Sequence, residues 1–146
     1  MNWEAISAVS EIVGAIAVVV SLIYVAAQIR QNTKMMRSAA KQSLTEASQN
    51  FLYMAIDRSE EWVKLTSGED PATTEEDARM TLIIRAMLRG FESQCYQYDS
   101  GLLEEDEWHA LQTTIQWVCA LPGVNKKWQE LKPHMSARLV KVVDNE

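Results

Sequence analysis

The chain has 146 residues, room for one ordinary domain, and a membrane span would leave about 110 residues for a soluble core. It carries 14 basic and 20 acidic residues, which argues against a nucleic-acid partner, because phosphate contacts need clustered Lys and Arg. The only cysteines, Cys95 and Cys119, are far apart in the sequence, which excludes a disulfide framework or a four-cysteine zinc site within one chain. We expect both to be buried, in a reducing compartment.

A long apolar run occupies the N-terminal part of the chain. Residues 12 to 29 read IVGAIAVVVSLIYVAAQI, eighteen positions without a charge, and apolar residues ahead of them lengthen the run to about 25. At 1.5 Å per residue this is enough to cross a hydrocarbon core of about 30 Å. A domain this small would struggle to cover such a helix on every side, so we predict a transmembrane anchor over residues 1–30.

The charges that flank this run predict its orientation. Residues 1–29 contain two acids and no Lys or Arg, and the next twelve positions contain no acid and four bases. These bases form a collar: Arg30, Lys34, Arg37 and Lys41. Basic residues prefer the cytoplasmic side, which predicts an external N-terminus and a cytoplasmic C-terminal domain. A cleaved signal peptide would carry basic residues ahead of its apolar run, so we expect the segment to be retained as an anchor.

Small and polar residues share one face of this predicted helix, at spacings of three and four. They are Ser7, Ser10, Glu11, Gly14, Ala17, Ser21 and Gln28. The opposite face carries Val9, Ile12, Ile16, Val19 and Ile23. Helices in a bilayer associate through close backbone approach and side-chain hydrogen bonds, for which small residues four apart are a recurring device. The pattern predicts helix packing, against the alternative that Gly, Ala and Ser are simply common in membrane helices.

Glu11 is the ionisable residue on that face. A carboxylate at the edge of an apolar span is costly unless it meets water, a partner or an aqueous cavity, which marks it as a candidate functional residue. In a span centred near Val19, however, Glu11 would lie close to the outer headgroups. Simple solvation there is the competing interpretation.

The rest of the chain predicts helices and no sheet. Apolar positions keep the three- and four-residue spacing to Met54 without Gly or Pro, so we expect the anchor helix to continue as a stalk over residues 31–57, about 80 Å in all. Residues 58–146 show helical periodicity between turn signals, and no segment alternates with period two. The predicted fold is all-α: a transmembrane helix, its cytoplasmic stalk and a small helical bundle.

Helix boundaries in the bundle follow from capping and turn residues. Asp57 with Glu60 resembles a cap for a short helix, and Thr73 with Glu76 forms a capping box for the next. We expect a further helix from near Leu103, stopped by residues 121–123, then a short helix and a last one over 136–143. Apolar stripes predict a core in which these residues take part: Met80, Ile84, Met87, Phe91, Tyr98, Trp108, Leu111, Ile115 and Val118. Trp62, Trp117 and Trp128 are expected in core or interface packing.

No set of residues in the sequence indicates a catalytic or metal-binding site. Glu105 and Asp106 lie four and three positions before His109, so they share its helix face, but a metal site needs further ligands and no paired carboxylate and histidine motif recurs. No glycine-rich phosphate loop or nucleophile motif is present. We therefore predict a non-enzymatic protein with no cofactor and no metal.

Several segments together resemble a widespread family of uncharacterised small bacterial membrane proteins. They are the opening WEAISAVSEIVGAIAVVVSLIYVAAQIRQNT, the stretch from Phe91 through Tyr96, Gln97 and Gly101 to Trp108, the Pro122–Gly123 pair, Trp128, and residues 136–143. Members of that family tend to have an aromatic residue where this chain has Met135. The resemblance implies a single-pass protein of the bacterial inner membrane with a helical cytoplasmic domain, and it implies no activity.

Two functions remain open. The first is a homo-oligomer whose anchor helices pack through the small-polar face and, with enough copies, line a pore. The second is a membrane-tethered adaptor whose acidic helical domain binds another membrane or cytoplasmic protein. The expected partners are thus the lipid bilayer, further copies of the chain or a second protein, and not nucleic acid.

Overall fold

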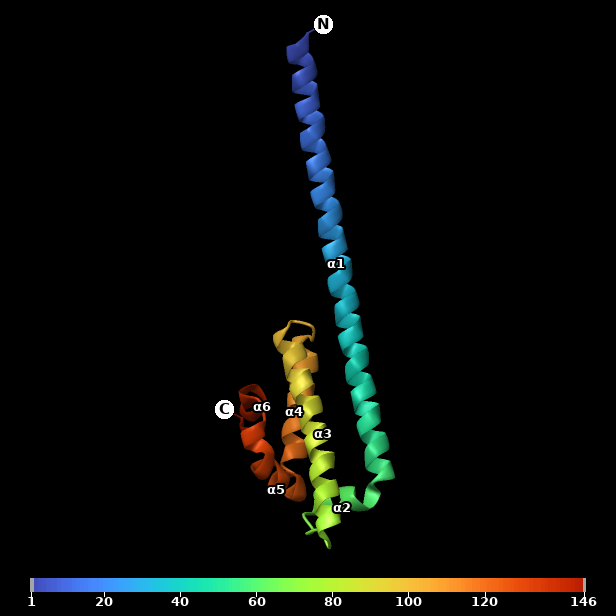
Figure 1. Cartoon of the computed structure of the whole chain (residues 1–146), viewed down its shortest axis with the longest axis vertical. Coiled ribbons are helices and arrows are strands. Elements are labelled where there is room, and N and C mark those ends of the chain that lie inside the picture. The colour runs from blue at the N-terminus through green and yellow to red at the C-terminus, as the bar shows by residue number, and fades with distance from the viewer. Residues whose placement is uncertain (1, 146) are drawn as a thin grey trace. The chain divides into compact units, whose positions relative to one another are not determined.

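The computed structural model describes residues 2–145, with nothing described for the side chain of Ala5, and within that range the fold is all-α with no strand (Figure 1). A long apolar N-terminal helix is followed by a small helical bundle, as the sequence predicted. The elements are α1 (Trp3–Asp57), α2 (Ser59–Ser67), α3 (Thr74–Asp99), α4 (Glu105–Cys119), α5 (Pro122–Leu131), the 3₁₀ turn η1 (Lys132–His134) and α6 (Ala137–Asp144).

The chain divides into two compact units, Met1–Ala39 and Ala40–Glu146. The first unit consists of the N-terminal part of α1. The second contains the remainder of α1 and the five shorter α-helices that follow it within the described range. Because 40–57 contain no Gly or Pro, nothing interrupts the helical hydrogen bonding of α1 before Asp57.

The cap at the start of α2 differs from the prediction. Asp57 is the last residue of α1, and Arg58 occupies the cap position of α2 without a side-chain hydrogen bond to the helix. The two helices are separated by a single residue, and the Arg58 N–H itself donates to the Met54 carbonyl at 2.9 Å. So short a connection leaves no room for a separate turn in which Asp57 could cap α2.

The α3 cap is formed by Thr73, whose side chain accepts a hydrogen bond from the Glu76 N–H at 3.1 Å. The Glu76 carboxylate accepts from the Ala72 N–H, one residue further out than a capping box requires, and also pairs with Lys64 at 2.7 Å. Thr73 therefore caps as predicted, while Glu76 instead joins α3 to α2.

The turn between α4 and α5 also differs in detail from the prediction. Helix α4 ends at Cys119, and Pro122 and Gly123, expected as stop signals, form the first turn of α5. Proline is favoured at a first helical position because its missing N–H is not needed there. The last helix begins as expected, with the Ser136 hydroxyl accepting from the Leu139 N–H at 3.3 Å.

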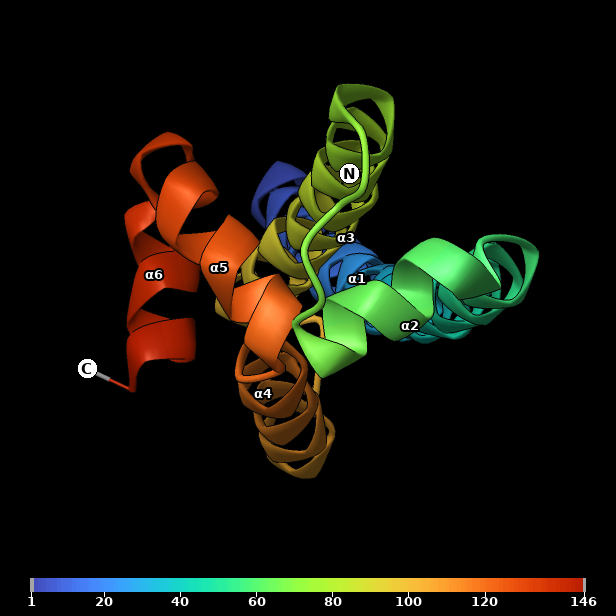
Figure 2. The ribbon, with the colours of Figure 1, turned by 90° about the horizontal axis from the view of Figure 1, so that it is seen from below.

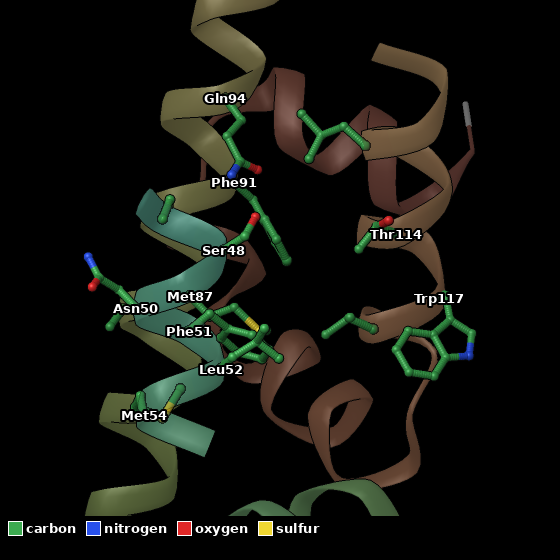
Figure 3. Close-up of a pocket in the computed structure, with 15 residues that line it drawn as sticks. Ser48, Asn50, Phe51, Leu52, Met54, Met87, Phe91, Gln94, Thr114 and Trp117 are labelled. Atoms are coloured by element: carbon green, nitrogen blue, oxygen red, sulfur yellow. The ribbon is translucent and has the colours of Figure 1, made fainter. Parts of the chain in front are cut away.

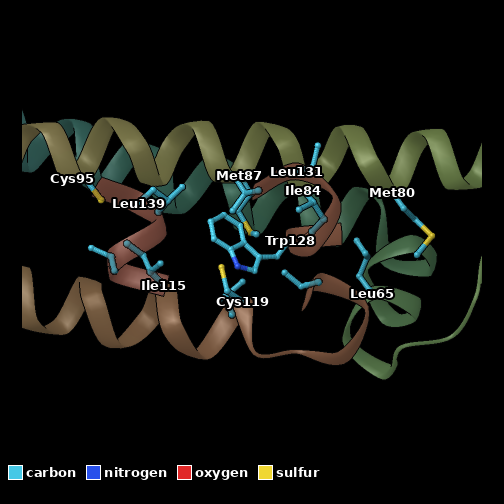
Figure 4. Close-up of a cluster of buried hydrophobic side chains, with 14 of the residues drawn as sticks. Leu65, Met80, Ile84, Met87, Cys95, Ile115, Cys119, Trp128, Leu131 and Leu139 are labelled. Atoms are coloured by element: carbon cyan, nitrogen blue, oxygen red, sulfur yellow. The ribbon is translucent and has the colours of Figure 1, made fainter. Parts of the chain in front are cut away.

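The core of the second unit lies where the short helices α5 and α6 pack against the long helices α3 and α4 (Figure 2). Trp128 of α5 is fully buried at its centre, with Met87 of α3 on one side and Cys119 of α4 on the other (Figure 4). Both cysteines are free and buried, as expected. The predicted apolar stripes do form this core, with Phe91, Tyr98 and Leu111 only partly buried at its edge.

Trp117, predicted to take part in core or interface packing, does not lie in the core. Its side chain is 64% exposed, because it lies beside Val118 on the helix and points away from the face that buries Ile115 and Val118. Trp62 is partly buried and meets the ring of Phe51 edge-on, with 5.1 Å between ring centroids.

Gly123 marks the closest approach between two helices. A Cβ atom added there would lie 2.6 Å from the Leu65 carbonyl oxygen and 2.9 Å from the Leu65 Cα atom, so only glycine lets α5 rest on the end of α2. Gly68, which ends α2, has a φ of +79° in the left-handed region that favours glycine. The two glycines join the start of the bundle to its C-terminal half.

Candidate functional site

The apolar segment of α1 is the candidate site in the first unit. By length and composition, α1 is the one helix among residues 2–145 that could cross a membrane, and the most apolar part of it is not buried within the chain at all. Its large aliphatic side chains, such as Ile12, Ile16 and Ile23, remain about 60% exposed. So continuous an apolar surface on one helix is unusual for a soluble domain, which buries such a stripe.

The helix is uninterrupted through the predicted packing face, so residues spaced by three and four lie on one side of it. Ser7, Ser10, Glu11, Gly14, Ala17, Ser21 and Gln28 share that side and are all exposed. Val9, Ile12, Ile16, Val19 and Ile23 lie on the other side, also exposed. The helix thus gathers its short and polar side chains on one face, with Val18 and Val25 among them, and has mostly branched aliphatic side chains on the other.

The hydroxyl groups of Ser10 and Ser21 on the small-polar face are satisfied within the helix. Ser10 donates to the Ile6 carbonyl at 2.9 Å and Ser21 donates to the Ala17 carbonyl at 2.8 Å. Near the end of the face, the Gln28 amide donates to the Tyr24 hydroxyl at 2.8 Å. Serine that bonds back to its own helix presents little unpaired polarity, so this face can meet an apolar environment at low cost.

Gly14 lies near the middle of the small-polar face and leaves the helix backbone bare. A Cβ atom added to it would meet nothing within 4 Å beyond its own helix. No contact within the described chain therefore requires glycine at this position. Glu11, one turn earlier, is exposed on the same side.

The four collar residues differ in their surroundings. Arg30, Lys34 and Arg37 are exposed on α1 in the first unit. Lys41 belongs to the second unit, where its Nζ lies 2.7 Å from a Glu107 carboxylate oxygen of α4. The hydrogen bond that Lys41 donates to Glu107 raises the pKa of Lys41. Sequence reasoning missed this partner, since no local pattern connects positions 41 and 107.

The pair of Glu105 and His109 forms on the surface of α4. His109 Nε2 lies 3.4 Å from a Glu105 carboxylate oxygen, and both side chains are 68% exposed. Among the described residues no group of three or more His, Cys, Asp or Glu side chains comes together as metal ligands would. The contact is an exposed pair of the kind that contributes little to stability.

Comparison of the chain with protein-family models, curated proteins and solved structures gave no match. The resemblance to a bacterial membrane family therefore stays a prediction from the sequence.

Proposed function

We propose that this chain is a non-enzymatic membrane protein that is anchored by α1 and forms homo-oligomers through the small-polar face of that helix. The observation that carries the proposal is the pairing of opposite faces on one exposed helix: Gly14, Ala17 and Ser21 on one side and Ile12, Ile16 and Ile23 on the other. The branched aliphatic face suits lipid tails. The short face suits a second helix backbone.

Which faces of such helices associate depends on whether water or lipid surrounds them. In water, apolar burial would drive association of such helices through their most apolar faces, but in lipid that driving force between helices disappears. Close packing then determines which faces associate, and small residues such as Gly, Ala and Ser let two backbones approach. Because the hydroxyls of Ser10 and Ser21 already bond to their own helix, contact through this face does not leave these two donors unpaired.

The collar supports an orientation with the N-terminus outside and the second unit in the cytoplasm of a bacterial cell. Arg30, Lys34 and Arg37 follow the apolar segment directly and are exposed. The preceding residues include Glu4 and Glu11 and no base. Under the proposal the second unit is the part of the oligomer that is exposed to the cytoplasm.

The test is the mass of the particle extracted by mild detergent when the protein is expressed alone. The proposal predicts a protein that stays in the membrane pellet after alkaline carbonate washing and an extracted particle that contains a defined number of identical chains. Release by carbonate would contradict the anchor. A monomer would contradict the oligomer.

A pore is the more specific form of the oligomer. With enough copies, the face bearing Glu11 could surround a lumen, and the carboxylates would form a ring near its outer end that favours cations. In planar bilayers, Glu11→Gln is then expected to lower cation preference, and Glu4→Gln, nearer to bulk water, to matter less. Absence of conductance in the unmodified protein would remove the pore and leave the oligomer.

A tethered adaptor is the second candidate function. Residues 42–146 carry 18 acids and 10 bases, a net charge of −8, and yet Leu82, Tyr96 and Trp117 are each more than 60% exposed in this acidic unit. Exposed aromatic residues are enriched at protein interfaces. A monomer that enlarges only in the presence of a host protein would favour the adaptor over the oligomer.

A further inference from the structure

A groove opens in the second unit between residues 47–54 of α1 and the helices α3 and α4 (Figure 3). Its volume is about 550 Å³, within the range of about 300 to 1,000 Å³ that small-molecule sites occupy. All the residues that line it belong to the second unit. The groove is separate from the small-polar face of α1 and does not depend on self-association through that face; only its test rests on the proposed anchoring by α1.

The lining is mostly apolar and carries no charge. Its main side chains are Phe51, Leu52, Met54, Met87, Phe91 and Leu111. None of the 15 lining residues is Asp, Glu, Lys, Arg or His. A bound carboxylate or phosphate would find no cation here, and a bound ammonium would find no carboxylate, so the lining favours an uncharged molecule.

Gln94 is the buried polar residue of the lining, which also includes the exposed polar residues Ser48, Asn50 and Thr114. Its side chain is 92% buried, being 8% exposed, and Figure 3 shows its carboxamide pointing from α3 toward the groove. The Oε1 atom is buried and accepts no hydrogen bond within the described structure. A buried acceptor without a donor costs about 1–3 kcal/mol, and native proteins rarely keep one. A donor supplied by a ligand would remove that cost.

The floor of the groove is a stripe of small residues that leads to this acceptor. Ala86, Gly90 and Gln94 follow one another at four-residue intervals on α3, so they lie in one row along the helix. A Cβ atom added to Gly90 would meet nothing within 4 Å. The missing side chain creates space beside the unpaired oxygen, where a chain-like molecule could lie.

We propose that this groove binds an uncharged amphiphile with an alkyl or isoprenoid chain and a hydroxyl or amide donor. The apolar chain lies along Ala86 and Gly90 between the aromatic side chains of Phe51 and Phe91. The donor group of the ligand makes its hydrogen bond to Gln94 Oε1. Specificity then comes from one hydrogen bond, and most of the affinity comes from apolar contact.

The test uses the full chain in lipid nanodiscs with ¹³C-labelled methionine methyl groups, in the absence of detergent, which is itself an amphiphile. Met54 and Met87 line the groove, whereas Met80 and Met135 do not and serve as internal controls. The probes are 1-dodecanol, dodecanoate and dodecane at equal lipid concentration. The expected result is a saturable shift of the Met54 and Met87 signals with dodecanol, weaker binding of dodecane, and weakest binding of dodecanoate.

Two variants distinguish the contribution of the hydrogen bond to Gln94 from that of the space beside Gly90. Gln94→Leu is expected to weaken dodecanol binding about tenfold, the effect of one net hydrogen bond, and to leave dodecane binding unchanged. Gly90→Leu fills the groove and is expected to abolish the shifts for all probes, and Gly90→Ala is its matched control with nearly the native space. Unchanged Met80 and Met135 signals show that each variant is folded.

Three results would overturn the proposal. The first is equal binding of all three probes, and the second is unchanged dodecanol binding in Gln94→Leu. The third is a shift of Met54 and Met87 with protein concentration alone, which would assign the groove to a second copy of the chain.

Discussion

At the scale of single residues, Gly123 shows how little space the bundle leaves between α2 and α5. Its backbone lies against the Leu65 carbonyl group, and that contact involves backbone atoms that cannot rotate away. The neighbouring Pro122 Cβ lies 2.7 Å from the position a Cβ would take at Gly68. Both glycines are therefore required by packing, and not only by turn geometry.

The first prediction follows from that contact. Gly123→Ala is expected to destabilise the second unit by about 1–3 kcal/mol, the usual cost of overpacking, as measured by urea unfolding. Gly90→Ala is the matched control, since its Cβ meets nothing within 4 Å, and it should stabilise α3 by up to about 1 kcal/mol. Equal destabilisation by both variants would contradict the packing assigned to Gly123.

The second prediction concerns the two thiols. Burial raises the pKa of Cys95 to about 11 and that of Cys119 to about 12, and each side chain is 1% exposed. Because the thiolate is the reactive form, native protein at pH 8 should react with iodoacetamide far more slowly than unfolded protein does. Rapid labelling of either thiol without denaturant would show that the core opens around it.

At the scale of elements, Asp144 holds the end of α6 to the bundle. Its carboxylate lies 2.5 Å from Lys132 Nζ and accepts a hydrogen bond of 3.3 Å from the indole N–H of the buried Trp128. The hydrogen bond from Lys132, assisted by Trp128, keeps the pKa of Asp144 below its usual value although partial burial opposes this. A lowered pKa means that the ionised form stabilises the folded state.

The third prediction is a pH dependence with a definite sign. The stabilisation by Asp144 is complete above the unfolded pKa of about 3.9 and is lost as the pH falls through the lower folded value. Asp144→Asn should therefore lower the melting temperature at pH 7, and the difference from the parent should shrink between pH 5 and pH 2. A difference that is constant with pH would mean that the charge has no role.

The fourth prediction concerns the two faces of α1. Gly14→Leu and Ser21→Leu place bulky side chains where two backbones are expected to approach, so each should raise the apparent dissociation constant of the oligomer about tenfold or more. Ile16→Leu on the aliphatic face should change it little. Fluorescence energy transfer between labelled chains in vesicles gives the measurement, and equal effects on both faces would contradict the packing argument.

At the scale of the whole molecule, the sequence predicted the fold class because its strongest signals are long and periodic. Helix α1, whose stalk is predicted over residues 31–57, ends at Asp57, since no Gly or Pro interrupts the pattern before the Arg58 connection. The apolar stripes that include Ile84 of α3 and Ile115 of α4 likewise predicted the core. Patterns of this length tolerate local exceptions.

What the sequence did not predict depends on contacts between distant residues. Pro122 can end one helix or begin the next; it begins α5, where Gly123 lies against Leu65. The ion pair of Lys41 with Glu107 leaves no local trace in the sequence. In the sequence, Gln94 is one of several polar residues of α3. Only the folded structure shows that it is buried and that its Oε1 atom has no hydrogen-bond donor.

The central claim is that α1 lies in a membrane and meets further copies of itself through its small-polar face. The most direct test is a scan of single cysteines, in a background where Cys95 and Cys119 are replaced by Ala, with oxidative cross-linking in isolated membranes. The account predicts cross-linked dimers at positions 10, 14, 17 and 21 and none at positions 9, 12, 16 and 23. Cross-links on the aliphatic face, or none on either face, would contradict it.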